Sequence, residues 1–423
     1  VRDAILSHLE RLVSFDTRNP PRLIDEGGIF AYCASQLAGF EVRIRDHGAG
    51  SVSLFATRGT PKILVNVHLD TVPSSPAWTA DPHVLRVVGD RAIGLGACDI
   101  KGAAAALLAA VQRVPGDIAL LLTSDEEAND ARGVAAFLAE KQAFDAVLVA
   151  EPTNCEAVLA HRGIGSVLVN FSGHAGHASG ANAMLDSALH QAVHFSNALL
   201  DRVEADKALR FGGLTGLRLN IGRIEGGIKA NMIAPTTELR FGFRPLPSQD
   251  IDRLHADFRA MLPVAERATY QETFRGPSLP SGDVATAEER RLAARDIADA
   301  LVLPIGNAVD FWTEASLFSQ AGYDALVFGP GDIAQAHTAD EWVAIEQLER
   351  AAQLVQDRAN VAPDQTQRCA RTNGLRPAER AQLRHQPLQA CDIVRQIGRR
   401  IGRAHKGRVT HPDPTPPGRR PES

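Results

Sequence analysis

The sequence predicts an α/β fold into which a smaller α+β unit is inserted, and three observations support this class. Helix and strand patterns alternate from Ile5 to about Gly163. Four short runs are apolar almost throughout, as strands buried on both faces of a parallel sheet require. A different order, strand-helix-strand-strand-helix-strand, follows from about residue 164 to residue 275. The four apolar runs are 63–67, 118–122, 147–150 and 326–329.

Residues 1–163 and 276–360 are predicted to form one discontinuous domain that carries the parallel sheet. A chain of 423 residues exceeds the usual size of a single hydrophobic core, so two domains are expected. The first residues, Val1 to Leu6, have an amphipathic helix pattern. The Ala-rich segment 103–111 is expected to be a buried or half-buried helix.

The inserted unit, residues 164–275, is predicted to have the split ferredoxin-like order of elements. Its second helix is expected to begin with Ser248 as N-cap. Strands are predicted at 166–171, 217–221, 238–244 and 268–274, and helices at 183–203 and 248–261.

The last segment, residues 361–423, has a different composition and is predicted to be mostly disordered. It holds 12 Arg and 1 Lys against 3 Asp and 2 Glu, several prolines, and little sustained apolar periodicity. A basic tail that binds nucleic acid is the functional alternative. A foreign extension of the chain would have the same composition.

Composition restricts the class of function. With 44% hydrophobic and 22% charged residues, the chain is typical of a soluble globular protein. The aromatic share of 5% and the net charge of −5 argue against a nucleic acid partner. No run of 18 uncharged apolar residues occurs, so no membrane span is expected. Five widely spaced cysteines without a C-x-x-C pair indicate reduced thiols, and a cytoplasmic enzyme is the simplest interpretation.

Side chains that can bind a metal follow three of the predicted strands. His68 and Asp70 come at the end of the first run, Glu126 and Glu127 after the second, and Glu151 after the third. Open α/β sheets bind ligands beyond the carboxyl ends of parallel strands. His68 and Asp70, two residues apart on a strand, are predicted to project on the same side, about 6.5 Å apart. One of them can bind a metal while the other supports it.

Two loops supply further candidates. Asp99 lies in the Gly-rich loop 94–102, which lacks the spacing of a phosphate-binding loop. Cys98 is expected to pack, because no second thiol lies near it in sequence. His337 lies in a polar loop that is predicted to precede a helix.

This set predicts two histidine and three carboxylate ligands, with one of Glu126 and Glu127 left as a free base. Such ligands suit Zn²⁺, Co²⁺ or Mn²⁺. Five ligands exceed the needs of one open catalytic zinc site. A pair of divalent ions, spaced about 3.5–4 Å, is therefore predicted.

The motifs V-N-V-H-L-D, G-x-x-D-I-K-G, S-D-E-E, A-E-P-T and A-H-T-A-D-E occur in this order within residues 1–360. As a set they resemble the dinuclear zinc family of acetylornithine deacetylase, succinyl-diaminopimelate desuccinylase, aminoacylase and carboxypeptidase G. The resemblance implies a zinc-peptidase-like three-layer catalytic domain, an inserted lid and dimerisation domain, and two Zn or Co ions. It also implies that Asp70 orients His68, and that Glu126 is the general base. The ligand sets it implies are His68, Asp99 and Glu151 for one ion, and Asp99, Glu127 and His337 for the other.

The inserted unit carries the other residues that the resemblance singles out. His177, in G-H-A-G-H-A-S, matches the lid histidine that reaches the partner subunit's active site in a homodimer and polarises the scissile carbonyl. Asn231 is the matching substrate contact. Arg244 matches an arginine that binds a substrate carboxylate through its planar fork.

Within the family, segments 160–163, 211–216 and 310–315 are most similar to a branch that deacetylates N-acetyl-L-citrulline, where arginine synthesis runs through acetylated intermediates. The predicted function is therefore hydrolysis of this small-molecule substrate to L-citrulline and acetate. Deacetylation of N-acetyl-L-ornithine is the first alternative, followed by succinyl-diaminopimelate desuccinylase or aminoacylase activity. Outside the enzyme class, an inactive homologue that binds acyl-amino acids is the alternative. The presence of Glu126 together with all five ligands argues against it.

Overall fold

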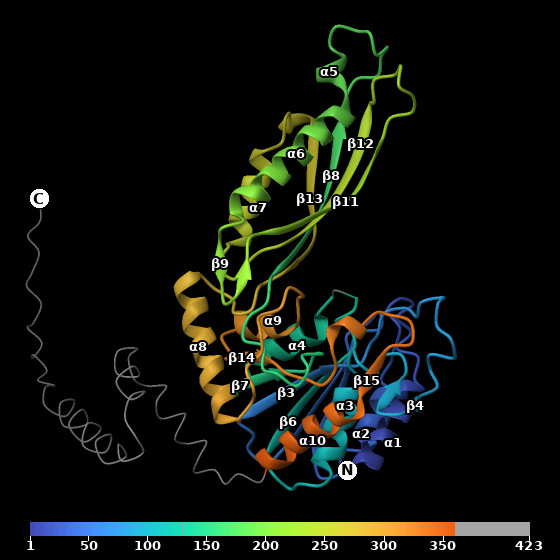
Figure 1. Cartoon of the computed structure of the whole chain (residues 1–423), viewed down its shortest axis with the longest axis vertical. Helices are drawn as coiled ribbons and strands as arrows, with labels where there is room; N and C mark the ends of the chain where they lie inside the picture. The colour runs from blue at the N-terminus through green and yellow to red at the C-terminus, as the bar shows by residue number, and fades with distance from the viewer. Residues whose placement is uncertain (129, 360–423) are drawn as a thin grey trace, which may run out of the picture. The chain divides into compact units, whose positions relative to one another are not determined.

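The computed structural model describes residues 1–128 and 130–359, and the basic segment 361–423 lies outside them. The described chain contains a six-stranded sheet and a four-stranded sheet (Figure 1). Both belong to one compact unit, so the division into domains at 163/164 and 275/276 stays a prediction. The larger sheet has the order β1 (Glu41–Asp46), β2 (Val52–Arg58), β6 (Ile118–Thr123), β3 (Ile63–His68), β7 (Ala146–Val149) and β14 (Ala325–Val327).

The predicted parallel core of the larger sheet is confirmed. β3 pairs in parallel with β6 and β7, and β14 pairs in parallel with β7. All residues of β6 and β7 are buried, as expected for strands covered on both faces. β2 and β1 extend the sheet in the antiparallel sense. The parallel strands therefore bring their carboxyl ends to one edge.

Helices cover both faces of this sheet and make the three layers of the predicted α/β class. Along β6, Leu120 and Leu122 enter one buried cluster while Ala119 and Leu121 enter the other, as the two-residue period of a strand requires. The first cluster includes residues of α1 (Arg2–Val13), α3 (Lys101–Val111) and α10 (Ile345–Ala359), and the second includes residues of α4 (Arg132–Ala139) and α9 (Ala315–Gln320).

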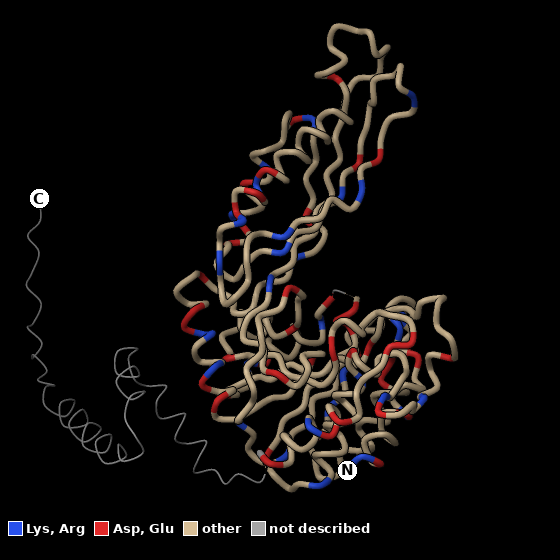
Figure 2. Tube along the Cα trace, in the orientation of Figure 1, with Lys and Arg blue, Asp and Glu red and all other residues tan. Residues whose placement is uncertain are grey.

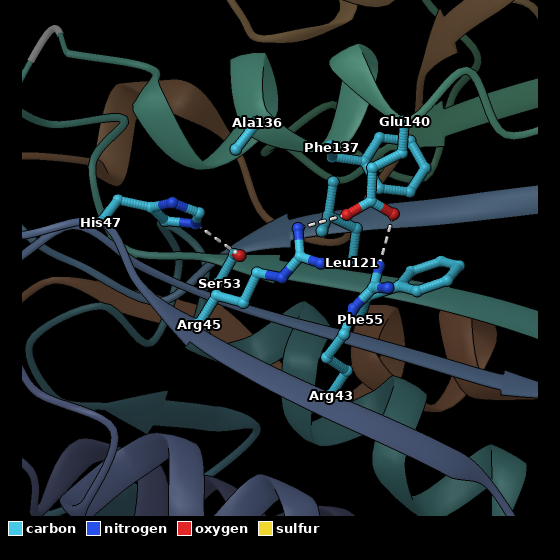
Figure 3. Close-up of a pocket in the computed structure, with 9 residues that line it drawn as sticks. All are labelled: Arg43, Arg45, His47, Ser53, Phe55, Leu121, Ala136, Phe137 and Glu140. Atoms are coloured by element: carbon cyan, nitrogen blue, oxygen red, sulfur yellow. Dashed lines mark hydrogen bonds and ion pairs between the residues drawn. The ribbon is translucent and has the colours of Figure 1, made fainter.

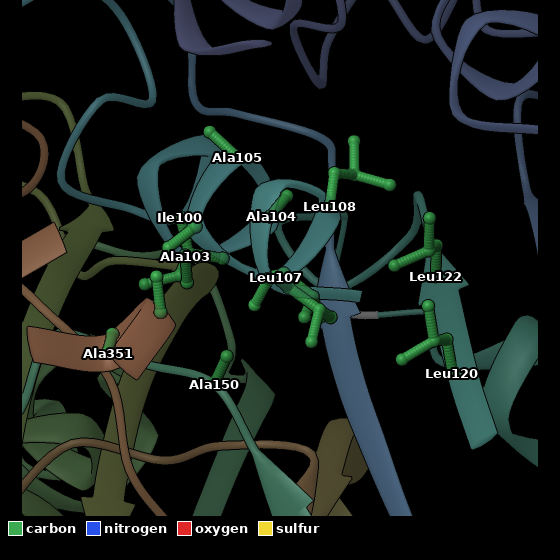
Figure 4. Close-up of a cluster of buried hydrophobic side chains, with 14 of the residues drawn as sticks. Ile100, Ala103, Ala104, Ala105, Leu107, Leu108, Leu120, Leu122, Ala150 and Ala351 are labelled. Carbon is green, nitrogen blue, oxygen red and sulfur yellow. The ribbon is translucent and has the colours of Figure 1, made fainter. Parts of the chain in front are cut away.

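Helix α3 is buried on every side, because its small side chains permit close packing. All 11 of its residues are buried. Figure 4 shows its Ala and Leu side chains beside Leu120 and Leu122 of β6, with Ala351 of α10 nearby. A Cβ on Gly102 would lie 2.3 Å from the backbone oxygen of Ala97, so only glycine fits there. The helix begins at Lys101, two residues after Asp99.

The four-stranded sheet is antiparallel and is built from the inserted unit, with the predicted order of strands and helices. Its order is β11-β12-β8-β13, the arrangement of a split ferredoxin-like unit. Phenylalanines from strands and helices form its core. The elements are β8 (Ile164–Ser172), α5 (Ala183–Asp186), α6 (Ala188–Asp206), β9 (Arg210–Phe211), β10 (Leu214–Thr215), β11 (Arg218–Gly226), β12 (Thr236–Arg244), α7 (Ile251–Ala260) and β13 (Ala268–Gly276).

Details of this unit differ from the prediction because side chains cap the helices. The helix predicted at 183–203 is two helices, α5 and α6, since Ser187 is extended and its hydroxyl accepts a backbone N–H of the first turn of α6. Ser248 is not the N-cap of the next helix. Asp250 is the N-cap, and α7 begins at Ile251. The hairpin β9-β10 was not predicted.

A third sheet lies beside the polar loop that contains His337. The strand β15 (Trp342–Ala344) follows this loop and pairs antiparallel with β5 (Arg91–Ile93), so the prediction that a helix comes next is wrong. Helix α10 begins directly after β15. The remaining elements are α2 (Gly28–Ser35), β4 (Arg86–Val88), β5 (Arg91–Ile93), α8 (Val284–Ala300), β15 (Trp342–Ala344) and the 3₁₀ turns Ala265–Arg267 and Ile333–Gln335.

Charged residues of both signs are interspersed along the described chain (Figure 2). At the sheet edge, Arg43 and Arg45 of β1 both pair with Glu140, which follows α4 (Figure 3). These partly exposed pairs contribute at most about 1 kcal/mol each. Among the described residues, no helix is long and apolar enough to cross a membrane.

Candidate active site

Three parallel strands of the larger sheet, β3, β6 and β7, end at the same edge of that sheet. β3 ends at His68, β6 ends at Thr123, and β7 ends two residues before Glu151. The segments continue side by side beyond the strands, since the N–H of Leu69 donates to the oxygen of Thr123 at 2.7 Å and the N–H of Ala150 donates to the oxygen of Asn66 at 2.9 Å. The side chains that follow the strands are therefore close in space.

The first cluster of potential ligand atoms is buried. Nε2 of His68 lies 3.1 Å from Oδ1 of Asp99 and 3.9 Å from Oε1 of Glu151. The ligand atoms of these three residues all lie within 4.8 Å of one another. One ion can contact all three side chains from such a position.

The second cluster shares Asp99 with the first. Nε2 of His337 lies 3.0 Å from Oε1 of Glu127 and 3.4 Å from Oδ2 of Asp99. Here too the three ligand atoms lie within 4.8 Å of one another. Because Oδ1 of Asp99 faces His68 and Oδ2 faces His337, this carboxylate has the arrangement of a bridge between two ions. His337 is half exposed and has a positive φ of 60°, an uncommon backbone conformation for a residue with a side chain.

Asp70 contacts the opposite side of the His68 ring. Nδ1 of His68 lies 3.1 Å from the backbone oxygen of Asp70 and 3.5 Å from its Oδ1. The prediction that Asp70 lies on the same strand as His68 is wrong, because β3 ends at His68, two residues before Asp70. Asp70 also accepts hydrogen bonds from Nδ2 of Asn19 at 2.7 Å and from the N–H of Glu127 at 3.0 Å. With its N–H on Nδ1, His68 leaves the Nε2 lone pair for a metal.

The loop before Asp99 needs glycine at Gly96. Its φ is +79°, and a Cβ there would lie 2.7 Å from Cγ2 of Thr71 and 3.0 Å from Cδ of Lys101. Cys98 is buried, belongs to neither cluster, and its thiol donates to the oxygen of Asp332 at 3.3 Å. Burial raises the pKa of this thiol, so it stays protonated and packs as an apolar residue.

The histidines carry raised pKa values because acids surround them. Hydrogen bonds to Asp99 and Glu127 raise the pKa of His337 to about 10. Burial lowers the pKa of His68, but Asp70, Asp99 and Glu151 raise it well above its usual value. The raised pKa values of the two histidines indicate a negative electrostatic potential at the site. A bound divalent cation would neutralise this potential.

The carboxyl groups of the two clusters also have shifted pKa values. Burial raises the pKa of Glu151 well above its ordinary value, and the charge of Asp99 adds to this. Burial also raises the pKa of Glu127, against its hydrogen bond with His337. In Asp99, burial raises the pKa, but bonds to both histidines outweigh it and the net shift is downward. Two imidazoles and three carboxylates thus fit a pair of divalent ions both in donor chemistry and in charge.

Glu126, which directly precedes Glu127, belongs to neither cluster of potential ligand atoms. Burial raises its pKa well above the usual value, His68 lowers it, and the charges of Glu127 and Glu151 raise it further. The pKa of Glu126 thus responds to groups of both clusters, which indicates that the carboxyl group lies close to them. A carboxyl group without a ligand position and with a raised pKa is suited to take up and release a proton.

The structure does not place the three candidates of the inserted unit in either cluster. His177 is exposed, and its Nδ1 lies 2.7 Å from Oγ of Ser179. The loop of Asn231 runs beside it, because the N–H of Ala178 donates to the oxygen of Asn231 at 3.1 Å. Arg244 ends β12 and is half buried, and among the described residues no ion pair engages its guanidinium.

Two contacts near the site were not anticipated. Asn19 holds Asp70 and also donates from Nδ2 to the oxygen of Ser124 at 3.1 Å. Its only sequence signal is its position before two prolines, which indicates a rigid turn but names no partner. Oε2 of Glu314 accepts from the hydroxyl of Thr123 at 3.2 Å, at the end of β6.

Comparisons with known proteins identify the family of the chain. A family model described as peptidase family M20/M25/M40 matches residues 64–360. The chain is 68% identical over 351 residues to N-acetyl-L-citrulline deacetylase of Xanthomonas campestris pv. campestris, which covers 83% of this chain and 96% of that one. It is 30% identical over 322 residues to acetylornithine deacetylase of Salmonella paratyphi B, over 73% of this chain and 79% of the relative.

A solved structure shows the same fold at low sequence identity. Aminopeptidase PepT from Bacillus cereus superposes with a TM-score of 0.65 at 19% identity, over 84% of this chain and 97% of that one. The family resemblance that the motifs predicted is confirmed by the matched family model and the 68% identical relative. The chain belongs to peptidase family M20/M25/M40.

Proposed function

We propose that the chain is an amidohydrolase with two divalent ions that removes the acetyl group from N-acetyl-L-citrulline and releases L-citrulline and acetate. The observation that carries the proposal is Asp99, whose two carboxylate oxygens face the histidines of two clusters. The 68% identity to a deacetylase of this substrate supports the choice of substrate.

Two sets of side chains would hold the ions. Zn²⁺ or Co²⁺ suits both sets, because imidazole and carboxylate ligands are combined without a thiolate. When bound, the ions would activate water and polarise the amide carbonyl as Lewis acids. One ion would be held by His68, Asp99 and Glu151, and the other by Asp99, Glu127 and His337.

Glu126 would carry the proton during hydrolysis. Its carboxylate takes a proton from the attacking water while the water oxygen bonds to the acetyl carbonyl carbon. The same proton then passes from Glu126 to the amide nitrogen as the C–N bond breaks, so acetate and a free amine leave. Asp70 keeps the ring of His68 in the ligating tautomer through its contacts with Nδ1.

The surroundings of two acids favour citrulline over ornithine. An ornithine ammonium needs an ionised carboxylate, and Asp310 and Glu314 are the two acids of segment 310–315, one of the segments that resemble the citrulline branch. Asp310 already pairs with Arg162. Burial raises the pKa of Glu314 to about 8, so this group is largely protonated at neutral pH. A neutral carboxylic acid can donate to and accept from a ureido group, which has both kinds of hydrogen-bonding group.

The inserted unit would serve as the lid and as the contact with a second copy of the chain. His177 would polarise the scissile carbonyl in the partner's site, with Asn231 contacting substrate and Arg244 binding its carboxylate. The absence of an ion pair at Arg244 within the described chain supports that role. Exposed apolar side chains around His177 and Asn231 support a homodimer contact. They are Met184 (64% exposed), Leu185 (71%), Ile228 (76%) and Met232 (44%).

A place in arginine synthesis and a cytoplasmic location are part of the proposal. Loss of the acetyl group converts an acetylated intermediate to free citrulline, which is the step that such a route needs. All three cysteines within the described residues are free thiols, which supports a reducing compartment.

The test compares release of free amine from N-acetylcitrulline, N-acetylornithine and succinyl-diaminopimelate under identical conditions. A site built around a ureido group is expected to favour N-acetylcitrulline in kcat/KM by as much as about 10⁴-fold. A ratio near one, or one that favours N-acetylornithine, would assign the chain to the acetylornithine alternative. Failure to hydrolyse any of the three by protein that carries two ions per chain would support the inactive homologue instead.

A further inference from the structure

We propose that Glu341 is a positioning residue that holds Asp99 between the two histidines, a role that rests on the proposed metal centre. Glu341 is 2% exposed and lies four residues after His337. It ends the A-H-T-A-D-E motif but takes no part in the chemistry proposed above. Its carboxylate binds the backbone of the Gly-rich loop instead.

Three backbone N–H groups converge on this one carboxylate. Oε1 of Glu341 accepts from the N–H of Cys98 at 2.8 Å and from that of Asp99 at 2.9 Å. Oε2 accepts from the N–H of Gly96 at 3.1 Å. Because three N–H groups within four residues bond to one buried carboxylate, the path of residues 96–99 is closely defined. The carboxylate therefore acts on Asp99 through its backbone.

Glu341 also connects two of the three loops that supply ligands to the second cluster, those of Asp99 and His337. Its backbone oxygen accepts from the N–H of Gly94 at 3.1 Å, and β15 begins at the next residue and pairs with β5. His337 lies on the other side of Glu341 in sequence. A displacement of Glu341 would thus move Asp99 relative to His337, and the spacing of these two ligands determines whether one ion can contact both.

The variant Glu341→Gln keeps the size of the side chain but replaces one acceptor oxygen with an NH₂ donor. At least one of the three N–H groups then faces a donor and loses its bond. The neighbouring Asp340 offers a matched control. Its Oδ1 accepts from the hydroxyl of Thr79 at 3.0 Å and pairs with Arg86 at 2.6 Å, so Asp340→Asn removes a charge without touching the Gly-rich loop.

The experiment measures Zn²⁺ affinity of the full chain by competition with a chromogenic chelator, together with unfolding of the metal-free protein. We expect Glu341→Gln to bind Zn²⁺ about 10–100-fold more weakly than wild type, the usual effect of removing a group that orients a ligand. Its metal-free form should still unfold cooperatively, and Asp340→Asn should keep the wild-type affinity. An affinity for Glu341→Gln within twofold of wild type, or an equal loss in Asp340→Asn, would overturn the inference.

Amide hydrogen exchange of the metal-free wild-type protein tests the same contacts even if the variant fails to fold. The amides of Gly96, Cys98 and Asp99 should be protected before any ion binds, because Glu341 holds them in the free protein. Exchange at the rate of an open loop would overturn the inference. A wild-type chain that binds no Zn²⁺ would overturn the metal centre and this inference together, whereas equal affinity of wild type and Glu341→Gln overturns the inference alone.

Discussion

Replacement of Arg162 by Met should show how strongly one buried cation holds the two sheets of this chain together. Arg162 is fully buried and precedes β8. Its guanidinium donates to the backbone oxygens of Thr215 at 2.8 Å, Gly216 at 2.5 Å and Arg244 at 3.4 Å, and it pairs with Asp310. One side chain thus joins the entry of β8, the end of the β9-β10 hairpin and the segment before α9.

The contacts allow the magnitude to be worked out. Met fills most of the space of the Arg stem but leaves the buried carbonyl of Gly216 and the partly buried carbonyl of Thr215 without this donor. Each unsatisfied carbonyl costs about 1–3 kcal/mol, and the partly buried one lies at the low end of this range. Asp310 is 63% exposed, so water solvates its carboxylate after the change. Loss of that pair adds at most about 1 kcal/mol. The free energy of unfolding should therefore fall by about 2–5 kcal/mol.

Urea unfolding of the metal-free protein, followed by circular dichroism, measures this quantity without a contribution from bound ions. Arg218→Met is the matched control, because Arg218 is 58% exposed and lies 3.9 Å from the same Asp310. Its loss should cost less than about 1 kcal/mol. Similar losses in the two variants, or a loss below about 1 kcal/mol in Arg162→Met, would refute the reasoning that the buried carbonyls set the cost.

The remaining predictions concern the base, the lid and a buried histidine. Glu126→Gln should keep its metal but lower kcat by about 10²–10⁴-fold. Glu127→Ala should instead lose metal. Equal metal loss in the two variants, measured by elemental analysis, would show that the two roles are misassigned. His177→Ala mixed with Glu126→Gln should regain activity after subunit exchange, and no rescue would contradict action across subunits. Burial lowers the pKa of His161 from 6.5 to about 4 in the folded chain. As the pH falls, the unfolded chain therefore protonates this histidine before the folded chain does. Unfolding free energy should then fall from about pH 6.5 towards pH 4, and His161→Gln should flatten that slope in urea titrations.

The parallel core and the ligand candidates could be predicted because their signals are local. Continuous Val, Ile and Leu runs marked β3, β6 and β7, and polar residues placed just after them had to lie at one sheet edge. The small residues of α3 likewise indicated a helix that packs closely. The motif set indicated the family, which the matched family model confirms.

The predicted ends of several helices and strands were wrong. Two of these errors arose because a side chain caps a helix and so fixes where it begins. Ser187 and Asp250 cap helices with their side chains, so the helix boundaries moved although the apolar pattern continued. Asp70 was expected on a strand, but β3 ends at His68. β15 is only three residues long, too short for a two-residue period to be recognised, and it replaced the helix expected after His337.

The sequence by itself determined the residue types of the site and the sheet edge on which most of them lie, because hydrophobic period and strand ends are properties of short segments. Only the tertiary structure decided that the two oxygens of Asp99 face different histidines, since that depends on how loops distant in sequence pack. His337 and Glu127 are 210 residues apart and lie 3.0 Å from each other in the folded chain, in which β15, five residues after His337, pairs with β5. The hydrogen bond from the N–H of Asp99 to Glu341 likewise could be found only in the folded chain, because no local pattern indicates which buried N–H groups a distant carboxylate will bind.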